Sequence, residues 1–282
     1  MPARAWCATG TSSYLSRPML LAFDIGNTET TVGLFAGDRL EGHWRLHSTP
    51  HRTPDEWAAA LTSQLTQAGH STQEIRAAIV ASVAPTITES LCDGVTAATT
   101  REPVRVDARS TLPLVLDVDE PLTVGADRIV NTLAALELFK RDTIVVDFGT
   151  ATTFDCITAD GPKGEGRFIG GVIMPGLRTA SDELVRRTAK LPATELLPPA
   201  RAIGRRTEDC IRAGVMWGTA DAVDGLVRRI KAEWPSQTRP LTVATGGLAS
   251  VVAPLCTQIE SVHPDLTLVG LRIAARALGL KW

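Results

Sequence analysis

Short apolar runs of strand length alternate along the chain with longer segments in which apolar residues recur every three or four positions. The first pattern is typical of buried strands, and the second is typical of helices that bury one face. In the first third, strands are expected at 20–24, 29–36, 40–47 and 75–84, with a tight turn at 25–28. Thr53 and Pro54 have the residue types of a helix start, so a helix is expected from there to Gly69.

The same alternation continues to the end of the chain, which predicts an α/β fold. The region 110–123 breaks it, since it is interrupted by prolines, and is interpreted as a linker or substrate loop. Helices are expected at 86–98, 124–141, 178–192, 207–234 (capped by Thr207) and 268–278, and strands at 104–107, within 143–157 and at 168–175, with strand, Gly-Gly turn and helix over 240–255.

One short pattern occurs twice. "LLAFDIGNTETTVGLF" and "TIVVDFGTATTFDCI" each carry an apolar strand, a turn of the form Asp-x-Gly, and a second strand. The turns begin at Asp24 and Asp147, about half a chain apart. Two copies that each open a run of hairpin and helix predict two related domains, placed at 19–125 and 126–282.

The chemistry of these turns suits phosphate. Gly26 allows the backbone to approach a ligand closely, and Asn27 and Thr28 add amide and side-chain donors, so the turn can form an anion-binding nest. Asp24 could hold Mg²⁺ or its water shell, and the cation would then bridge to phosphate oxygens. The second turn, Asp147-Phe148-Gly149-Thr150 with Thr152 and Thr153, offers the same parts. A plain hairpin turn is the alternative for either copy taken alone.

Two further motifs are candidates. In "GADR" (125–128), Asp127 could accept a proton from a substrate hydroxyl, and Arg128 could hold an anionic substrate. The plainer interpretation is that Asp127 complements the positive end of a helix. In "TGG" (245–247), Gly246 and Gly247 would let a planar adenine or a ribose lie against the backbone, although such a loop also serves simply to turn the chain.

Composition removes several classes of function. Apolar residues make up 44% of the 282 residues, charged residues 21%, and the net charge is −2, so no nucleic-acid or membrane partner is expected. Five scattered cysteines imply neither a disulfide framework nor a metal site, and a reduced, cytoplasmic protein is expected. Residues 1–18 lack a secretory core and are expected to be a disordered extension or a mis-assigned start.

Histidines give no metal motif either. His43, His47 and His51 recur every four residues, but Pro50 and Pro54 argue against a single helix there. A solvated connection is therefore expected in this stretch. Neither a P-loop nor a dinucleotide-binding glycine fingerprint occurs in the sequence.

The series D-x-G-N-T-x-x-x-x-G (24–33), G-A-D-R (125–128), D-F-G-T-A-T-T (147–153) and T-G-G (245–247) resembles the type III pantothenate kinases over essentially all of 19–282. The resemblance implies two ribonuclease-H-like domains of the sugar kinase, Hsp70 and actin superfamily, with a nucleotide cleft between them. It also implies a homodimer that phosphorylates pantothenate with ATP, Mg²⁺ and a monovalent cation (K⁺ or NH₄⁺), in the first step of coenzyme A synthesis.

The resemblance also carries roles onto residues. Asp24, Asn27 and Thr28 match the first phosphate motif, and Gly149, Thr150 and Thr152 match the second. Asp147 matches the monovalent-cation position, Asp127 the catalytic base, and Gly125 and Arg128 the pantothenate contacts. Thr188 resembles a threonine that the partner subunit contributes to the substrate pocket.

The match departs from the family at Val118, where a Tyr is usual, and at Glu120, where an Asn is usual before Pro121. This puts one wall of the substrate pocket in question. Two alternatives stay open at this point. One is a kinase for another small hydroxy acid, a sugar or acetate. The other is a non-catalytic, nucleotide-binding regulatory relative, which the intact aspartates disfavour.

Overall fold

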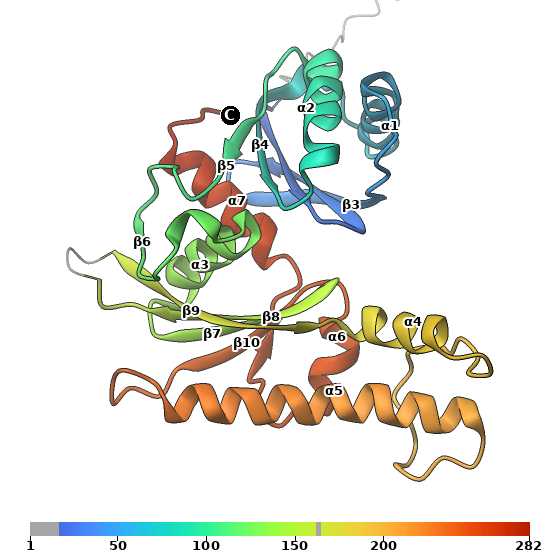
Figure 1. The fold of residues 1–282 in the computed structure, drawn as a ribbon. Coiled ribbons are helices and arrows are strands. Elements are labelled where there is room, and N and C mark those ends of the chain that lie inside the picture. The colour runs from blue at the N-terminus through green and yellow to red at the C-terminus, as the bar shows by residue number, and fades with distance from the viewer. Residues whose placement is uncertain (1–16, 162–164) are drawn as a thin grey trace, which may run out of the picture.

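The fold is described from a computed structural model, which covers residues 17–161 and 165–282. Two mixed sheets and their helices build the molecule (Figure 1). The strands are β1 (Met19–Ile25), β2 (Glu29–Ala36), β3 (Arg39–His47), β4 (Ile75–Ser82), β5 (Val104–Val106), β6 (Leu114–Leu116), β7 (Thr143–Phe148), β8 (Ala151–Thr158), β9 (Gly166–Pro175), β10 (Leu241–Thr245) and β11 (Ser261–Val262). The α-helices are α1 (Pro54–Gln67), α2 (Pro85–Thr99), α3 (Ala126–Phe139), α4 (Leu177–Arg187), α5 (Thr207–Ala232), α6 (Ala249–Val252) and α7 (Leu266–Ala277).

The first sheet has the strand order β3-β2-β1-β4-β5, in which β1 pairs antiparallel with β2 and parallel with β4. Its central strand is buried on both faces, because the run Met19–Ile25 carries apolar side chains at almost every position. Helix α1 starts as the sequence predicts. Thr53 and Glu56 form a reciprocal capping box, with Glu56 N donating to Thr53 Oγ1 (3.3 Å) and Thr53 N to Glu56 Oε2 (2.8 Å).

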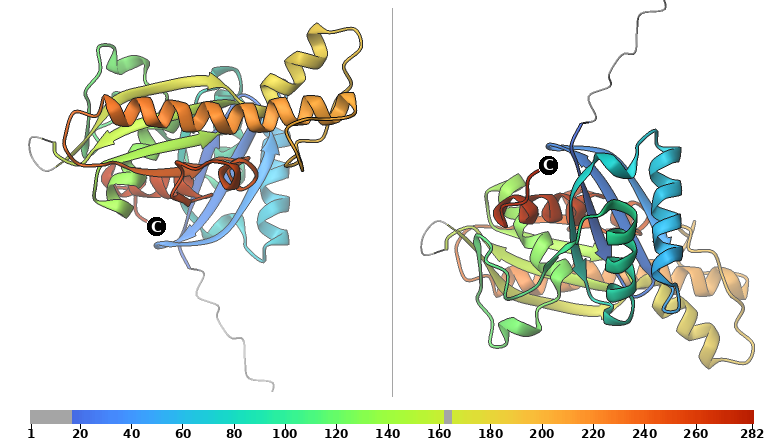
Figure 2. Two further views of the ribbon diagram at one scale, coloured as in Figure 1. Left: turned by 90° about the horizontal axis from the view of Figure 1, so that it is seen from below. Right: turned by 90° about the horizontal axis from the view of Figure 1, so that it is seen from above.

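The second sheet has the order β11-β10-β7-β8-β9-β6. Its β7–β8 hairpin repeats the β1–β2 hairpin of the first sheet, which agrees with the repeated sequence. The sheets and helices stack in alternating layers (Figures 1 and 2). Helices α1 and α2 cover one face of the first sheet, α3 and α7 fill the space between the two sheets, and α5 runs along the outer face of the second.

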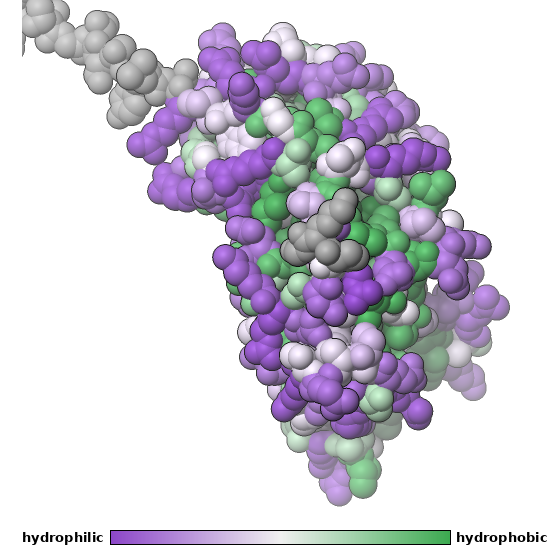
Figure 3. All heavy atoms as spheres, turned by 90° about the vertical axis from the view of Figure 1, so that its left-hand side faces the viewer, coloured by the Kyte–Doolittle hydropathy of each residue, from purple (hydrophilic) through white to green (hydrophobic). Residues whose placement is uncertain are grey.

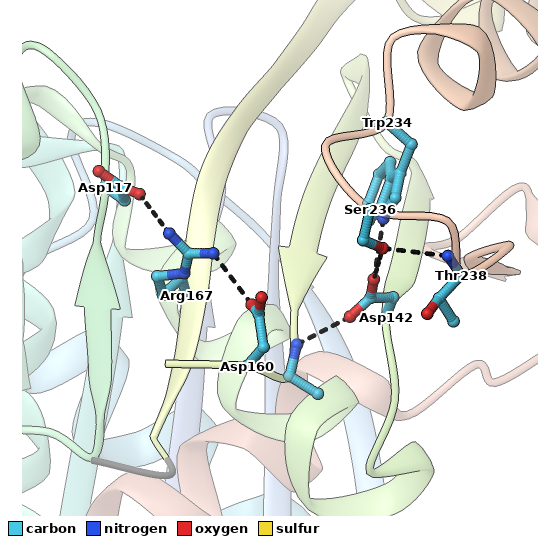
Figure 4. Close-up of polar contacts among 8 residues, drawn as sticks. Asp117, Asp142, Asp160, Arg167, Trp234, Ser236 and Thr238 are labelled. Atoms are coloured by element: carbon cyan, nitrogen blue, oxygen red, sulfur yellow. Dashed lines mark hydrogen bonds and ion pairs between the residues drawn. The ribbon is translucent and has the colours of Figure 1, made fainter. Parts of the chain in front are cut away.

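Polar contacts tie the second sheet to its surroundings at the end remote from the β7–β8 turn (Figure 4). Asp142, just before β7, accepts hydrogen bonds from Trp234 Nε1 (2.9 Å), Ser236 Oγ (3.1 Å) and the backbone N of Ala159 (3.0 Å). On β9, Arg167 donates to Asp117 and Asp160, both at 3.0 Å. These contacts hold the α5–β10 connection and the β6 segment against the sheet.

Strand β6 and its surroundings were not predicted. The segment 110–123 was expected to be irregular, but Leu114–Leu116 pairs parallel with β9 at the edge of the second sheet. The division at 125/126 stays a prediction, although β6 precedes it and joins the second sheet. On the side of the molecule that carries β6, apolar residues gather across the middle, between more polar parts above and below (Figure 3).

Other differences are small. The sequence prediction that Thr207 caps α5 is wrong, because Arg206 holds the capping position and Thr207 is the first helical residue. Helix α4 ends at Arg187 rather than 192. The predicted extension 1–18 lies outside the described residues except for 17 and 18, which form no regular element. In the part of the chain that the structure describes, no helix combines the length and apolar character needed to cross a bilayer.

Candidate active site

A cavity of about 620 Å³ opens between the two sheets, where three turns meet. They are the β1–β2 turn, the β7–β8 turn and the loop from β10 to α6. Most of the residues singled out from the sequence line this cavity: Asp24, Gly26, Asn27, Thr28, Asp127, Asp147, Gly149, Thr150, Gly246 and Gly247. The fold thus brings together motifs from four distant parts of the chain.

The first turn is fixed by one backbone hydrogen bond and one from a side chain. Gly26 N donates to Glu29 O (3.0 Å), and Ser48 Oγ donates to Gly26 O (2.7 Å). A Cβ atom at Gly26 would stand 2.9 Å from Glu29 O, so a side chain at this position would push the turn apart. Asn27 and Thr28 are exposed toward the cavity, which leaves their polar groups available to a ligand.

The second turn is one residue shorter, and its glycine N–H likewise donates to the first residue of the following strand. Gly149 N donates to Ala151 O (3.0 Å), and the carbonyl of Thr150 accepts from Gly176 N (3.1 Å) and from Thr179 Oγ1 (2.6 Å). The two turns touch each other, because the side-chain oxygens of Thr28 and Thr150 lie 3.0 Å apart. They form facing walls of one site.

The third turn depends on glycine geometry. Gly246 has φ +92°, and a Cβ atom there would collide with Asp147 Oδ1 and the backbone of Phe148. Leu248 N donates to Phe148 O (3.2 Å), which fastens the loop to the end of β7. Across the cavity, Arg45 lies against Gly247, since a Cβ atom at Gly247 would be 3.0 Å from Arg45 Nη1.

Three carboxylates gather at the bottom of the cavity. Burial, and the nearby charges of Asp127 and Asp147, raise the pKa of Asp24 well above its usual value. Burial also raises the pKa of Asp127, opposed by a hydrogen bond from the backbone N of Arg128 (2.8 Å). The pKa of Asp147 rises to about 6, mainly through burial. Each charge is costly here, so the arrangement favours a cation or a proton nearby.

Helix α3 positions Asp127 in its first turn, two residues after Gly125, which precedes the first helical residue. A Cβ atom at Gly125 would be only 2.5 Å from Asp127 Oδ1, so glycine makes room for the carboxylate. One turn further along the helix, Asn131 Nδ2 donates to Asp147 Oδ2 (3.1 Å), while Asn131 Oδ1 accepts from Thr267 Oγ1 (2.9 Å). Asn131 therefore links α3, β7 and α7 at the site.

Arg128 points away from this cavity. Its Nε donates to Asp155 Oδ1 (2.6 Å), its Nη2 donates to Phe154 O (3.1 Å), and its guanidinium lies 5.0 Å from the ring centre of Phe168. Asp127 and Arg128 are adjacent in sequence, yet only Asp127 lines the cavity. The guanidinium instead faces strands β8 and β9.

Two further predicted residues, besides Arg128, do not line the cavity. Thr152 is fully buried and does not line the cavity, whereas its neighbour Thr153 does, because successive side chains of a strand point to opposite faces. Thr188 follows the last turn of α4, where its Oγ1 donates to Leu184 O (2.9 Å), and it is not part of the cavity in this chain.

The sequence interpretation missed several lining residues. His43, Arg45 and His47 alternate on the exposed face of β3 and line the cavity, while Trp44 and Leu46 pack against the core. The solvated connection expected for the histidines therefore applies to His51 but not to the other two. The alternation H-x-R-x-H inside a predicted strand was the signal that could have found them.

The comparisons with known proteins agree with this geometry. The family model described as "Type III pantothenate kinase" matches residues 20–229. The chain belongs to the type III pantothenate kinase family. It is 42% identical over 255 residues to the type III pantothenate kinase of Moorella thermoacetica, which covers 90% of this chain and 98% of that one. To the Thermomicrobium roseum enzyme it is 43% identical over 256 residues, covering 91% and 96%.

Among solved structures, component A of (R)-2-hydroxyglutaryl-CoA dehydratase from Acidaminococcus fermentans aligns with a TM-score of 0.52 at 14% identity, covering 93% of this chain and 96% of that one. At that identity the likeness concerns the fold alone, and it agrees with the fold that the family resemblance implied. The kinase phosphorylates pantothenate, the first step of coenzyme A synthesis, and its family uses ATP.

The residues present fit the cations that such a kinase would bind. Asp24 and Asp147 line the cavity together with both turns. Asp24 receives no hydrogen bond within the described residues, whereas Asp147 receives one from Asn131. Among those residues, no group of three or more His, Cys, Asp or Glu side chains could enclose a metal ion alone. A cation here would therefore share its coordination with phosphate oxygens, water or backbone carbonyls.

Proposed function

We propose that the kinase transfers the γ-phosphoryl group of ATP directly to the terminal hydroxyl of pantothenate, with Asp127 as the general base. The observation that carries this proposal is that Asp127 lines the same cavity as both Asp-x-Gly turns. A carboxylate beside the phosphate site can accept the hydroxyl proton as the oxygen attacks in line. Its raised pKa improves its basicity while leaving it largely ionised above that pKa.

The two turns would hold the β- and γ-phosphates between them. Backbone N–H groups and the side chains of Asn27, Thr28 and Thr150 can donate to phosphate oxygens from opposite walls. Thr153 is a better candidate than Thr152 for a cavity-facing hydroxyl. Gly246 and Gly247 leave flat backbone on which the nucleoside can rest.

Cations would complete the phosphate site. Mg²⁺, bound to phosphate oxygens and to Asp24 directly or through water, would neutralise charge on the transferred group. Asp147 would hold a monovalent cation, K⁺ or NH₄⁺, with Asn131 fixing the carboxylate's second oxygen. Both assignments are supported by the crowding of negative charge around Asp24.

The pantothenate carboxylate would bind Arg128, whose guanidinium lies beside β8 and β9. Gly125 would contribute by admitting the Asp127 carboxylate at the start of α3. The atypical Val118 belongs to this neighbourhood, because a Cβ atom at Gly170 of β9 would stand 3.8 Å from Val118 Cγ1. A smaller apolar side chain there replaces the family's usual tyrosine, and Glu120, two residues further along the chain, is exposed.

We also propose a cytoplasmic homodimer. An apolar groove of about 610 Å³ lies between the end of β9, α4 and α5, and its lining includes Met174, Leu184, Leu191, Ile211 and Val215. A second copy would cover these side chains, and it could bring its Thr188 to the substrate pocket of the first. Sedimentation of the purified protein tests the dimer.

A substrate panel tests the function as a whole. Purified kinase is assayed for ADP formation with pantothenate, acetate, a hexose and a second small hydroxy acid, each with and without Mg²⁺ and K⁺. Turnover is expected with pantothenate alone and should depend on both cations. Nucleotide binding without turnover on any acceptor would favour a regulatory relative instead.

A further inference from the structure

A buried carboxylate outside the cavity is the strongest unexplained feature of the second sheet. Asp155 lies on β8 with no exposed surface, although an ionised carboxylate is among the costliest groups to bury. Its Oδ1 accepts the hydrogen bond from Arg128 Nε at 2.6 Å. Its Oδ2 is buried without a hydrogen-bond partner among the described residues.

This pair is an inefficient way to stabilise a fold. Well-packed apolar side chains often replace a buried ion pair without loss of stability, and an unsatisfied buried acceptor adds a further penalty. Burial raises the pKa of Asp155 to about 7, against the favourable charge and hydrogen bond of Arg128. A residue kept at such a cost indicates a functional role.

The surroundings of Arg128 are built around one orientation of its guanidinium. The ring of Phe168 lies 5.0 Å from it, and the carbonyl of Phe154 accepts from Nη2. Gly171 leaves the necessary space, since a Cβ atom there would come within 2.6 Å of Arg128 Nη2. Nε and one N–H of Nη2 are therefore engaged by protein. Nη1 makes no hydrogen bond within the described residues, so the Nη1–Nη2 edge keeps a free N–H on each nitrogen.

We infer that Asp155 is a positioning residue that fixes the Arg128 guanidinium so that its free edge meets the carboxylate of the substrate. Arginine recognises a carboxylate best through a planar, bidentate arrangement, which requires a fixed plane. Asp155 and Phe168 supply that plane from neighbouring strands. The inference rests on the proposed role of Arg128 as the carboxylate anchor.

The test measures selectivity for the substrate carboxylate. The readout is the ratio of kcat/KM for pantothenate to kcat/KM for its alcohol analogue, in which CH₂OH replaces the carboxylate. Asp155→Ala should lower this ratio about tenfold and raise KM for pantothenate, while KM for ATP stays within about twofold. Asp155→Asn keeps one acceptor for Nε, so it should lower the ratio only about threefold.

Asp142→Asn is the matched control. Asp142 is also a buried aspartate of the second sheet, but it lies at the opposite end of β7 from Asp147 and binds Trp234 and Ser236 (Figure 4). Its substitution should lower the melting temperature and leave the ratio unchanged. If Asp155→Ala does not fold, the Asn variant, which keeps the volume, gives the answer.

Arg128→Ala tests the anchoring role of Arg128 separately from the positioning role of Asp155. It should lower the ratio by more than any Asp155 variant. If Arg128→Ala leaves the ratio unchanged, the role of Arg128 is wrong and that of Asp155 with it. If Arg128→Ala lowers the ratio but both Asp155 variants keep the wild-type value, or shift both KM values alike, only the positioning role is overturned.

Discussion

Thr28 and Thr150 lie with their side-chain oxygens 3.0 Å apart, although 122 positions separate them in the chain. One belongs to the turn after β1 and the other to the turn after β7. The contact joins the two turns at the cavity, and both residues are exposed to it. A phosphate that entered between the turns would replace this mutual hydrogen bond with two stronger, charge-assisted ones.

Thr150→Val should therefore weaken the binding of ATP more than the binding of pantothenate. The substitution keeps the shape of the side chain but removes its hydroxyl, so KM for ATP is expected to rise about tenfold, while KM for pantothenate changes less than about threefold. Steady-state kinetics with each substrate varied in turn gives both values. Thr62→Val, on the exposed face of α1, is the control and should change neither. Equal rises in both KM values would contradict a phosphate role for Thr150.

Asp127→Asn should abolish turnover without preventing ATP binding. The amide preserves the size of the side chain but cannot accept the hydroxyl proton, so kcat should fall by about two to four orders of magnitude. Calorimetric titration with ATP should give a dissociation constant close to that of wild type. Near-wild-type turnover would remove Asp127 from the role of base.

The pH dependence of the wild-type enzyme follows from the same residue. Burial raises the pKa of Asp127, and a base must be deprotonated to act. Consequently kcat/KM should fall as pH decreases through this raised pKa, at a higher pH than an ordinary aspartate would give. A profile that stays flat down to pH values near 4 would contradict the assignment.

The sequence predicted the parts of this site that depend on local chemistry. The Asp-x-Gly turns, the start of α3 and the Gly-Gly loop all lie at the cavity. They could be predicted because a turn that needs glycine and short polar residues can be recognised from a few consecutive residues. Where each side chain points was harder. Thr152 was chosen over Thr153 by motif, and the strand's alternation reverses that choice.

Contacts between distant elements could not be predicted in this way. No motif singled out Asn131, and its bond to Asp147 exists only because α3 packs against β7. Strand β6 was missed for the same reason: the three residues that follow Pro113 form a strand only because β9 offers an open edge. Neither feature has a local pattern that would separate it from a loop or a helix surface.

In the ligand-free protein, the free energy of unfolding of Asp147→Asn should increasingly exceed that of wild type as pH rises. Burial raises the pKa of Asp147 to about 6, so the folded state holds the proton more tightly than the unfolded chain. The protonated group contributes stability below about pH 4, and this contribution is lost as pH rises through 6. The variant lacks that loss. Above pH 6 its free energy of unfolding should exceed that of wild type by on the order of 1–3 kcal/mol.

Melting temperatures between pH 4 and 8, in buffer without divalent or monovalent activators, test this prediction. Asp160→Asn is a control of opposite sign, because the hydrogen bond from Arg167 lowers the pKa of Asp160. Its variant should be less stable than wild type by an amount that stays nearly constant between pH 4 and 8, because stability from a lowered pKa is lost only below about pH 4. A constant difference between Asp147→Asn and wild type over this range would show that Asp147 is not buried as described. Activity of the Asn variant should also lose its response to K⁺.

Gly246→Ala should disturb the site more than the same substitution at another glycine with positive φ, Gly279. Gly246 and Gly279 both have positive φ, +92° and +79°, so alanine is disfavoured at either position by about 1 kcal/mol. A Cβ atom at Gly279 meets nothing within 4 Å, whereas one at Gly246 collides with Asp147 Oδ1 and the backbone of Phe148.

Gly279→Ala should therefore lower stability only modestly and leave KM for ATP unchanged. Gly246→Ala should lower stability further and raise KM for ATP at least about tenfold, because the clash displaces both the loop and the Asp147 carboxylate. Equal effects of the two substitutions on stability and kinetics would mean that the loop tolerates the added methyl group, and that the close approach of Gly246 to Asp147 is not needed for nucleotide binding.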